Sequence, residues 1–228
     1  MDRDTTRSKR AYRQFLSDLS RGRTDILVGT QMIAKGHDFP NITLVGVVSA
    51  DIALQWPDFR AAENTFQVLT QVAGRAGRGD SPGTVLVQTY NPEHYSIRFA
   101  RMHDYGGFFK EEMAFRQELD YPPYRRLILF HLAGNVEDKT REAAQRLAAK
   151  CQELLQQRPE FLQELQILGP VAAPHARVKG KHRWHVLLKS KKVVPLLEVG
   201  RKRGNWGYGE FKGFGVSLIA DVDPISLI

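Results

Sequence analysis

Residues 71–78 read QVAGRAGR, and this stretch decides the fold of the chain. Arg75 and Arg78 stand three positions apart, so at a helix end they project from the same side. The small residues around them let the backbone approach another surface closely. Two guanidinium groups presented in this way suit a phosphoryl group in transfer, whose charge builds up on its outer oxygens. A capped helix end with exposed arginines would show the same pattern, so the interpretation depends on the rest of the chain.

A second block lies about forty residues upstream, where residues 29–40 read GTQMIAKGHDFP. Thr30 and the N–H groups that follow it can hold a phosphate of a nucleic-acid strand. Gly36 permits a turn that a side chain would block. Asp38 can accept a hydrogen bond from a ribose hydroxyl or from an arginine of the first block.

Together the two blocks resemble the last two motifs of a superfamily 2 helicase, the half of an ATP motor that supplies arginines to a nucleotide held mainly by the other half. The resemblance implies arginine fingers at Arg75 and Arg78, and contacts near the nucleotide at Gly36, Asp38 and Gln71. The sequence contains no G-x-x-x-x-G-K-[ST] phosphate loop. We therefore expect ATP and Mg²⁺ to be bound mainly by a lobe outside this chain, and the chain alone to be inactive.

The resemblance narrows to one family, the primosomal replication-restart helicases (PriA). Further stretches that carry it are Asp2–Thr6, Asp58–Glu63, Leu168–Pro170, Arg183-Trp184 and Asp221–Pro224, so it covers nearly the whole chain. It implies an ATP-dependent 3′→5′ DNA helicase that acts in replication restart and primosome assembly at stalled forks. The expected partners are forked or single-stranded DNA, single-stranded-DNA-binding protein and other primosome proteins. The family also holds zinc, through cysteines that this chain lacks.

The first part of the chain alternates between strand and helix patterns. Helical spacing occurs at 10–21 and 61–76, and apolar or alternating runs predict strands at 25–29, 43–50 and 83–90. This order predicts an α/β fold, namely a partial RecA-like helicase lobe 2 with a parallel sheet and flanking helices. We assign this lobe to residues 1–93.

Residues 94–120 predict a helical connector of two helices that break at Gly106-Gly107, and the prolines of Tyr121–Tyr124 stop it. Residues 121–228 then predict a small α+β domain of order β-α-β-β-α-β on a mixed sheet, which the resemblance describes as S10-like. Its predicted elements are strands at 127–133, 165–174, 182–189 and 215–222, and helices at 136–157 and 192–204.

The net charge of +8 falls entirely in this last domain, because residues 1–120 carry 15 basic and 15 acidic side chains. Residues 171–212 alone hold 11 basic and 2 acidic residues. Such an excess suits a phosphate backbone, although a solvated surface has the same composition. Aromatic rings among the basic groups add a means of stacking on bases. The candidate DNA contacts are Thr30, Lys179, Lys181, Arg183, Arg201, Arg203 and Trp206, while Trp184 suits either stacking or the core.

Composition limits the class of protein and the kinds of site that the chain can contain. No apolar run approaches the ~18 residues of a membrane span, and the N-terminus lacks the apolar region of a secretory signal. A single cysteine, Cys151, excludes an internal disulfide and fits the cytoplasm. Asp51 at a strand end is interpreted as a structural or lobe-facing residue, and Asp221 and Asp223 as a capped strand terminus, so no metal site is predicted.

Two hypotheses of function remain. The chain is the C-terminal part of a DNA helicase, or it is a catalytically silent DNA- or partner-binding module that keeps the helicase lobe as a scaffold. Half of an RNA helicase is disfavoured, because Phe59–Glu63 and the C-terminal features match the DNA family. A phosphate loop upstream in the reading frame would separate the two hypotheses.

Overall fold

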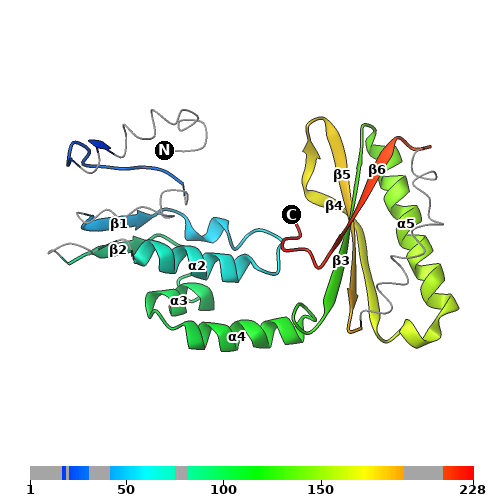
Figure 1. The fold of residues 1–228 in the computed structure, drawn as a ribbon, viewed down its shortest axis with the longest axis horizontal. Helices are drawn as coiled ribbons and strands as arrows, with labels where there is room; N and C mark the ends of the chain where they lie inside the picture. The colour runs from blue at the N-terminus through cyan, green and yellow to red at the C-terminus, as the bar shows by residue number, and fades with distance from the viewer. Residues whose placement is uncertain (1–16, 19–20, 31–41, 75, 77–81, 193–212) are drawn as a thin grey trace. The chain divides into compact units, whose positions relative to one another are not determined.

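The computed structural model describes residues 17–18, 21–30, 42–74, 76, 82–192 and 213–228 (Figure 1). Two compact units make up the chain. Unit 1 comprises residues 1–55 and 61–110, and unit 2 comprises residues 56–60 and 111–228. The three domains expected at 1–93, 94–120 and 121–228 stay a prediction.

Unit 1 is built around a parallel pair of strands. Its elements are β1 (Leu44–Val47), the short 3-10 helix η1 (Ala50–Ile52), α2 (Ala61–Ala73), β2 (Thr84–Val87), α3 (Tyr95–Arg101) and the start of α4 (Tyr105–Glu118). Strands β1 and β2 pair in parallel, in a register that runs from Leu44 opposite Thr84 to Val47 opposite Val87. The expected alternation of parallel strands with helices is confirmed.

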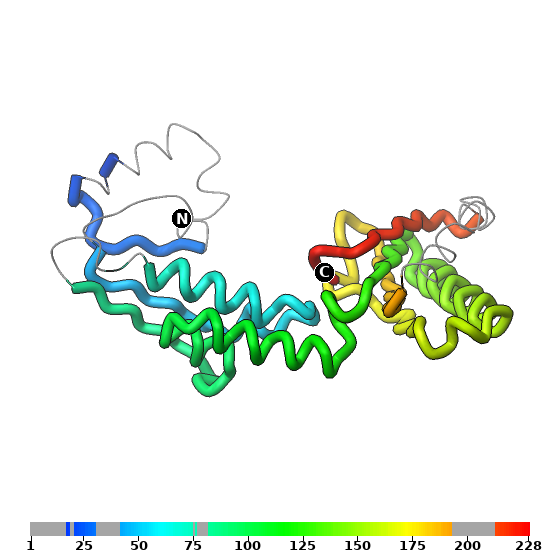
Figure 2. The backbone as a smooth tube through the Cα atoms, turned by 60° about the horizontal axis from the view of Figure 1, so that its bottom comes forward, coloured from blue at the N-terminus to red at the C-terminus, as the bar shows by residue number. Residues whose placement is uncertain are grey.

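The core of unit 1 forms where α2 meets α3 and α4. Phe66 and Leu69 are three residues apart on α2, so both side chains face inward, where they are buried. The ring of Phe66 stacks on that of Phe108 with 4.2 Å between centroids. Ile97 and Ala100 of α3 complete this cluster. Helix α2 runs alongside β1 and β2 in both views (Figures 1 and 2).

The strand predicted for residues 25–29 of unit 1 is wrong. The apolar run 25–29 forms no strand, and Ile26 and Val28 are 81% and 75% exposed. Extended backbone becomes a strand only where it pairs with a neighbouring strand, and the local pattern carries no information on that pairing. The predicted helix at 10–21 lies almost wholly outside the described residues.

The break between α3 and α4 falls at Met102–Asp104, and Gly106 and Gly107 lie inside α4. Asp104 caps α4, since its Oδ1 accepts from the Gly107 N–H at 2.8 Å. A Cβ on Gly107 would come within 2.4 Å of the Phe99 ring. The glycine is therefore required for α3 to approach α4 closely, and the sequence pattern did not distinguish this role from a helix break.

Unit 2 contains a four-stranded antiparallel sheet. Its elements are the end of α4, β3 (Arg126–Gly134), α5 (Glu137–Gln157), the 3-10 helix η2 (Pro159–Phe161), β4 (Leu165–Val178), β5 (Lys181–Ser190) and β6 (Val216–Val222). The strand order is β4-β5-β3-β6, and every neighbouring pair is antiparallel. The mixed sheet that we expected is wrong: β4 does run parallel to β3, but β5 lies between them. The helix expected at 192–204 lies, apart from Lys192, outside the described residues.

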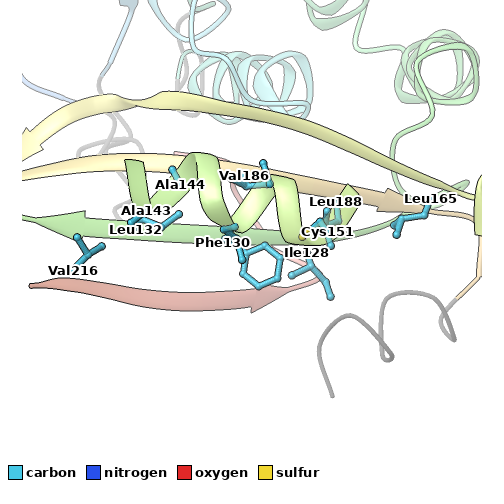
Figure 3. Close-up of a cluster of buried hydrophobic side chains, with 12 residues drawn as sticks. Ile128, Phe130, Leu132, Ala143, Ala144, Cys151, Leu165, Val186, Leu188 and Val216 are labelled. Atoms are coloured by element: carbon cyan, nitrogen blue, oxygen red, sulfur yellow. The ribbon is translucent and has the colours of Figure 1, made fainter. Parts of the chain in front are cut away.

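Helix α5 covers one face of this sheet (Figures 1 and 2). Alternate residues of β3, namely Ile128, Phe130 and Leu132, point toward it, as period-2 geometry requires (Figure 3). Leu147 and Cys151, four residues apart on α5, pack against them with no exposed surface. Burial raises the pKa of the Cys151 thiol to about 12, so this cysteine behaves as a small core residue.

Candidate functional site

Most of the predicted site lies outside the described residues. This applies to both predicted arginine fingers and to two residues expected near the nucleotide. It also applies to three of the expected DNA contacts. The residues concerned are Arg75, Arg78, Gly36, Asp38, Arg201, Arg203 and Trp206. Their roles stay predictions.

Two predicted residues border those segments. Gln71 lies on the last turn of α2 and is exposed, because the buried face of the helix is the one that carries Phe66 and Leu69. The helix ends at Ala73, and the N–H of Gly74 still bonds to the carbonyl of Thr70 at 3.1 Å. Thr30 is exposed on irregular backbone. The core of unit 1 therefore fixes the direction in which α2 leads into the QVAGRAGR block.

Asp51 holds together the loops that follow β1 and β2. Its carboxylate accepts from the Thr89 hydroxyl at 2.8 Å and from the Tyr90 N–H at 2.9 Å. The pKa of Asp51 is lowered, first by the Tyr90 N–H and then by the Thr89 hydroxyl. The structural interpretation of this carboxylate is therefore supported.

The structure brings Lys179, Lys181 and Arg183 together on one β-hairpin. Lys179 and Gly180 form its two-residue turn with φ angles of 49° and 80°, a left-handed pair typical of tight hairpins. Lys181 and Arg183 follow on alternate positions of β5, so they share a face of the sheet. We call residues 175–183 the basic hairpin.

The basic hairpin has no acidic counterpart along its strands. No Asp or Glu occurs from Leu165 to Lys192. Arg177, Lys179 and Lys181 are exposed, and Arg183 is half-buried. None of the four forms an ion pair with another described residue. The end of the hairpin therefore carries a positive charge that a phosphate backbone can neutralise.

Other basic residues nearby have structural roles that their sequence does not reveal. Lys189 is buried, donates to the Leu119 carbonyl at 3.1 Å and lies over the Tyr121 ring. Lys192 pairs with Glu164 at 2.6 Å. Counting lysines along 171–212 therefore overstates the charge available to a ligand.

Trp184, which the sequence left open between stacking and core, packs on the core beneath α5. The neighbouring His185 points to the opposite face, where its Nε2 lies 3.0 Å from Nδ1 of His131. Burial, then the nearby His131 and Arg183, lower the pKa of His185 to about 4. The pKa of His131 is also lowered, mainly by burial, so both imidazoles are neutral at neutral pH and one donates to the other.

An aromatic pair on the surface of unit 2 escaped the sequence analysis. The ring centroids of Trp56 and His175 lie 5.1 Å apart, and Trp56 is 37% exposed. His175 begins the basic hairpin, so this pair adds an aromatic surface next to its charges. The sequence feature that could have pointed to this pair is the position of Trp56 two residues before the DFRAAE stretch.

Of the two C-terminal aspartates, Asp223 forms an ion pair within unit 2. Both oxygens of Asp223 accept from the Arg126 guanidinium. Within the described ranges, no group of three or more His, Cys, Asp or Glu side chains could hold a metal ion. No helix among the same residues has the length and apolar character needed to cross a bilayer.

Comparison with known proteins identifies two domains. The family described as helicase conserved C-terminal domain matches residues 2–80, and the family described as primosomal protein N C-terminal domain matches residues 117–225. The first match implies that unit 1 contains part of a RecA-like lobe 2.

Similar proteins match along the whole chain. Replication restart protein PriA of Bacillus subtilis (strain 168) is 44% identical over 233 residues, which cover 100% of this chain and 28% of that protein. The protein of the same name from Synechocystis is 43% identical over 99% of this chain and 26% of its own length. That from Haemophilus influenzae is 38% identical over 100% of this chain and 30% of its own length.

The chain thus spans between a quarter and a third of these relatives. Its two domain matches and its similarity from end to end place it in the family of PriA replication restart proteins.

Proposed function

We propose that this chain is the C-terminal part of an ATP-dependent 3′→5′ DNA helicase that acts in replication restart and primosome assembly at stalled forks. The observation that carries the proposal is the similarity along the whole chain to proteins named for replication restart. The match to a helicase C-terminal domain supports a motor activity for the full-length protein.

In this proposal the two units have different tasks. Unit 1 supplies Arg75 and Arg78 to the transferring phosphoryl group, with Gly36, Asp38 and Gln71 beside the nucleotide. ATP and Mg²⁺ are bound mainly by a second lobe, which supplies the phosphate cradle. Thr30 contacts the backbone of the DNA strand.

Unit 2 binds forked or single-stranded DNA through the basic hairpin and the segment that holds Arg201, Arg203 and Trp206. The exposed cations of the hairpin form no ion pair with another described residue, which supports this role, because neutralising phosphates releases counterions. Single-stranded-DNA-binding protein and other primosome proteins are the proposed protein partners, and the cytoplasm is the proposed location.

DNA binding by the chain itself is the first test. We expect the pair Lys179→Ala and Lys181→Ala to weaken binding to duplex, single strand and fork alike. The slope of log K against log salt should fall by up to about 2, because two phosphate contacts are removed. Fluorescence anisotropy at several salt concentrations measures both quantities.

The matched control removes the same charge elsewhere. Lys110 and Lys139 are exposed on α4 and α5, outside the basic hairpin. The pair Lys110→Ala and Lys139→Ala should leave the slope close to that of the parent. Equal effects of the two pairs would show that the hairpin is only part of a diffuse charged surface.

The rival proposal, a silent binding module, makes the same prediction for DNA binding and differs in ATP turnover. A chimaera tests it, in which this chain replaces the matching part of the Bacillus subtilis relative. DNA-dependent ATP hydrolysis that is lost in Arg78→Ala, with nucleotide affinity retained, would support the arginine-finger role. A chimaera that binds DNA and never turns over ATP would support the silent module.

A further inference from the structure

A five-residue segment, Trp56–Arg60, packs in a unit other than the one that holds its neighbours in the chain. The residues before it, up to Gln55, and those after it, from Ala61, belong to unit 1. The segment itself belongs to unit 2. We call it the 56–60 segment. Its C-terminal end leads directly into α2, the helix that carries Gln71 and ends at the QVAGRAGR block.

Phe59 anchors the segment by ring stacking. Its ring lies nearly parallel to that of Tyr121, with 5.3 Å between centroids and 9° between planes. Each ring also lies against a cation: the Arg116 guanidinium is 5.2 Å from the Phe59 centroid, and Lys189 Nζ is 3.5 Å from the Tyr121 centroid. Stacked rings and cation–π contacts both depend on relative orientation, so they fix how Phe59 is held.

Asp58 anchors the segment a second time. Its Oδ1 accepts from the Arg60 N–H at 2.8 Å, which shapes the turn that enters α2. Its Oδ2 accepts from the Ser226 hydroxyl and from the Leu227 N–H, the latter at 3.0 Å. One carboxylate therefore holds the 56–60 segment to the end of the chain.

The partners of Phe59 are themselves held firmly. Arg116 donates to Glu112 at 2.6 Å and to the Pro122 carbonyl at 3.3 Å. Lys189 is buried and donates to the Leu119 carbonyl. A buried cation with defined partners has few alternative positions, so this anchor is a rigid one.

The same strand that carries Lys189 also carries part of the basic hairpin. Lys181 and Arg183 lie at the start of β5, and Lys189 lies six residues beyond Arg183. At the rise of a β-strand, that separation is about 20 Å. A series of packed groups therefore runs within unit 2 from the proposed DNA contacts along β5 to Lys189, Tyr121 and Phe59. The chain then continues from Arg60 into α2.

We propose that the 56–60 segment couples DNA binding on unit 2 to ATP hydrolysis, with Phe59 and Asp58 as the positioning residues that hold this segment in unit 2. This inference rests on the proposed function, and it assigns to the DFRAAE stretch a task beyond its family resemblance.

The test uses the chimaera with the Bacillus subtilis relative described above, and measures ATP turnover with and without forked DNA together with DNA affinity. Phe59→Leu keeps an apolar side chain and removes the stacking ring, and Phe59→Tyr keeps the ring. We expect Phe59→Leu to lower DNA-stimulated kcat by about tenfold, in the usual range of coupling energies. Basal kcat and the Kd for DNA should stay within about twofold, and Phe59→Tyr should restore stimulation.

Two controls separate coupling from a loss of structure. Phe109 is an exposed ring on α4 in unit 1, 6.1 Å from Tyr105, and Phe109→Leu should leave stimulation intact. Tyr121→Leu should lower stimulation as Phe59→Leu does, and the double variant should be no worse than either single one, because both remove the same contact.

The outcomes are distinguishable. A parent chimaera whose ATP turnover ignores DNA overturns the proposed function and the coupling with it. A stimulated parent whose Phe59→Leu variant is equally stimulated overturns the coupling alone. A parallel fall of basal and stimulated kcat, or a loss of DNA affinity that accounts for the effect, also overturns it, because the segment then has only a structural role.

Discussion

The two sheets of the molecule differ in how completely their strands are buried. In unit 2, β3 is buried at most of its positions, because α5 covers one face and neighbouring strands flank it on both sides. In unit 1, β1 and β2 leave large apolar side chains in the open, with Leu44 and Leu86 at 59% and 60% exposed. Parallel strands are ordinarily covered on both faces. Unit 2 thus completes its core from its own residues, whereas the strands of unit 1 are only partly covered.

This contrast predicts different sensitivities to mutation in the two units. Both tryptophans among the described residues, Trp56 and Trp184, belong to unit 2. Tryptophan fluorescence therefore follows unfolding of unit 2, while far-UV circular dichroism follows both units.

The largest expected effect is a cavity beneath α5. Leu147 has no exposed surface, so Leu147→Ala should lower the free energy of unfolding of unit 2 by about 2–5 kcal/mol. Urea titrations followed by tryptophan fluorescence measure this loss. The matched change in unit 1, Leu86→Ala on β2, should cost less than about 1 kcal/mol by circular dichroism, because it removes little buried surface. A cost for Leu86→Ala as large as that for Leu147→Ala would contradict the contrast.

Acid should destabilise unit 2 through its histidine pair. The pKa of His185 is lowered from 6.5 to about 4 in the folded state, mainly by burial, so the unfolded chain binds the proton more readily. The stability from the neutral ring is fully present above pH 6.5 and is lost as the pH falls toward 4. We expect a loss on the order of 2–3 kcal/mol across this range.

His185→Gln tests this effect, since it cannot titrate. Urea titrations at a series of pH values should show a flatter pH dependence for this variant than for the parent. His175→Gln, a change on the exposed hairpin, is the control and should retain the pH dependence of the parent. If the two variants showed the same pH dependence of stability, the His131–His185 pair would not be the source of the destabilisation by acid.

A smaller effect distinguishes two adjacent arginines in unit 2. Arg125 is buried, donates twice to Asp120 at 2.7 and 2.9 Å, and donates to the Glu164 carbonyl at 3.2 Å. Arg126 pairs with Asp223 where both side chains are 44% exposed. We expect Arg125→Ala to cost about 2 kcal/mol, and Arg126→Ala less than about 1 kcal/mol.

The dependence of stability on salt distinguishes these two arginines further. The cost of Arg126→Ala should shrink further at high ionic strength, because exposed pairs are screened, while that of Arg125→Ala should persist. Urea titrations at low and high salt measure both. If Arg125→Ala and Arg126→Ala lowered the free energy of unfolding equally at low salt, burial would not determine how much these ion pairs contribute to stability.

Local patterns predicted most of the regular structure. The apolar spacing of α5 and the alternation of β3, β5 and β6 placed these elements within a few residues of their bounds. In each case the buried face is continuous along the sequence, so local periodicity is sufficient. The run at 25–29 and the glycines of α4 were misread, because their states depend on a neighbouring strand and on the Phe99 ring.

The candidate site also has parts that the sequence predicted and parts that it could not. The sequence identified Lys179, Lys181 and Arg183, which the structure groups on one hairpin. It could not separate them from Lys189, because a buried and an exposed lysine have the same local pattern. Only the tertiary structure shows which cations already have partners.

The sequence by itself determined the family, through two short motif blocks whose spacing is set along the chain, and it determined where the excess charge lies. The tertiary structure alone decided the strand order β4-β5-β3-β6, the His131–His185 pair and the packing of Phe59 on Tyr121. The histidine pair and the stacked rings join residues 54 and 62 positions apart. Such contacts depend on chain reversals and on competition among many apolar surfaces, which no local pattern encodes.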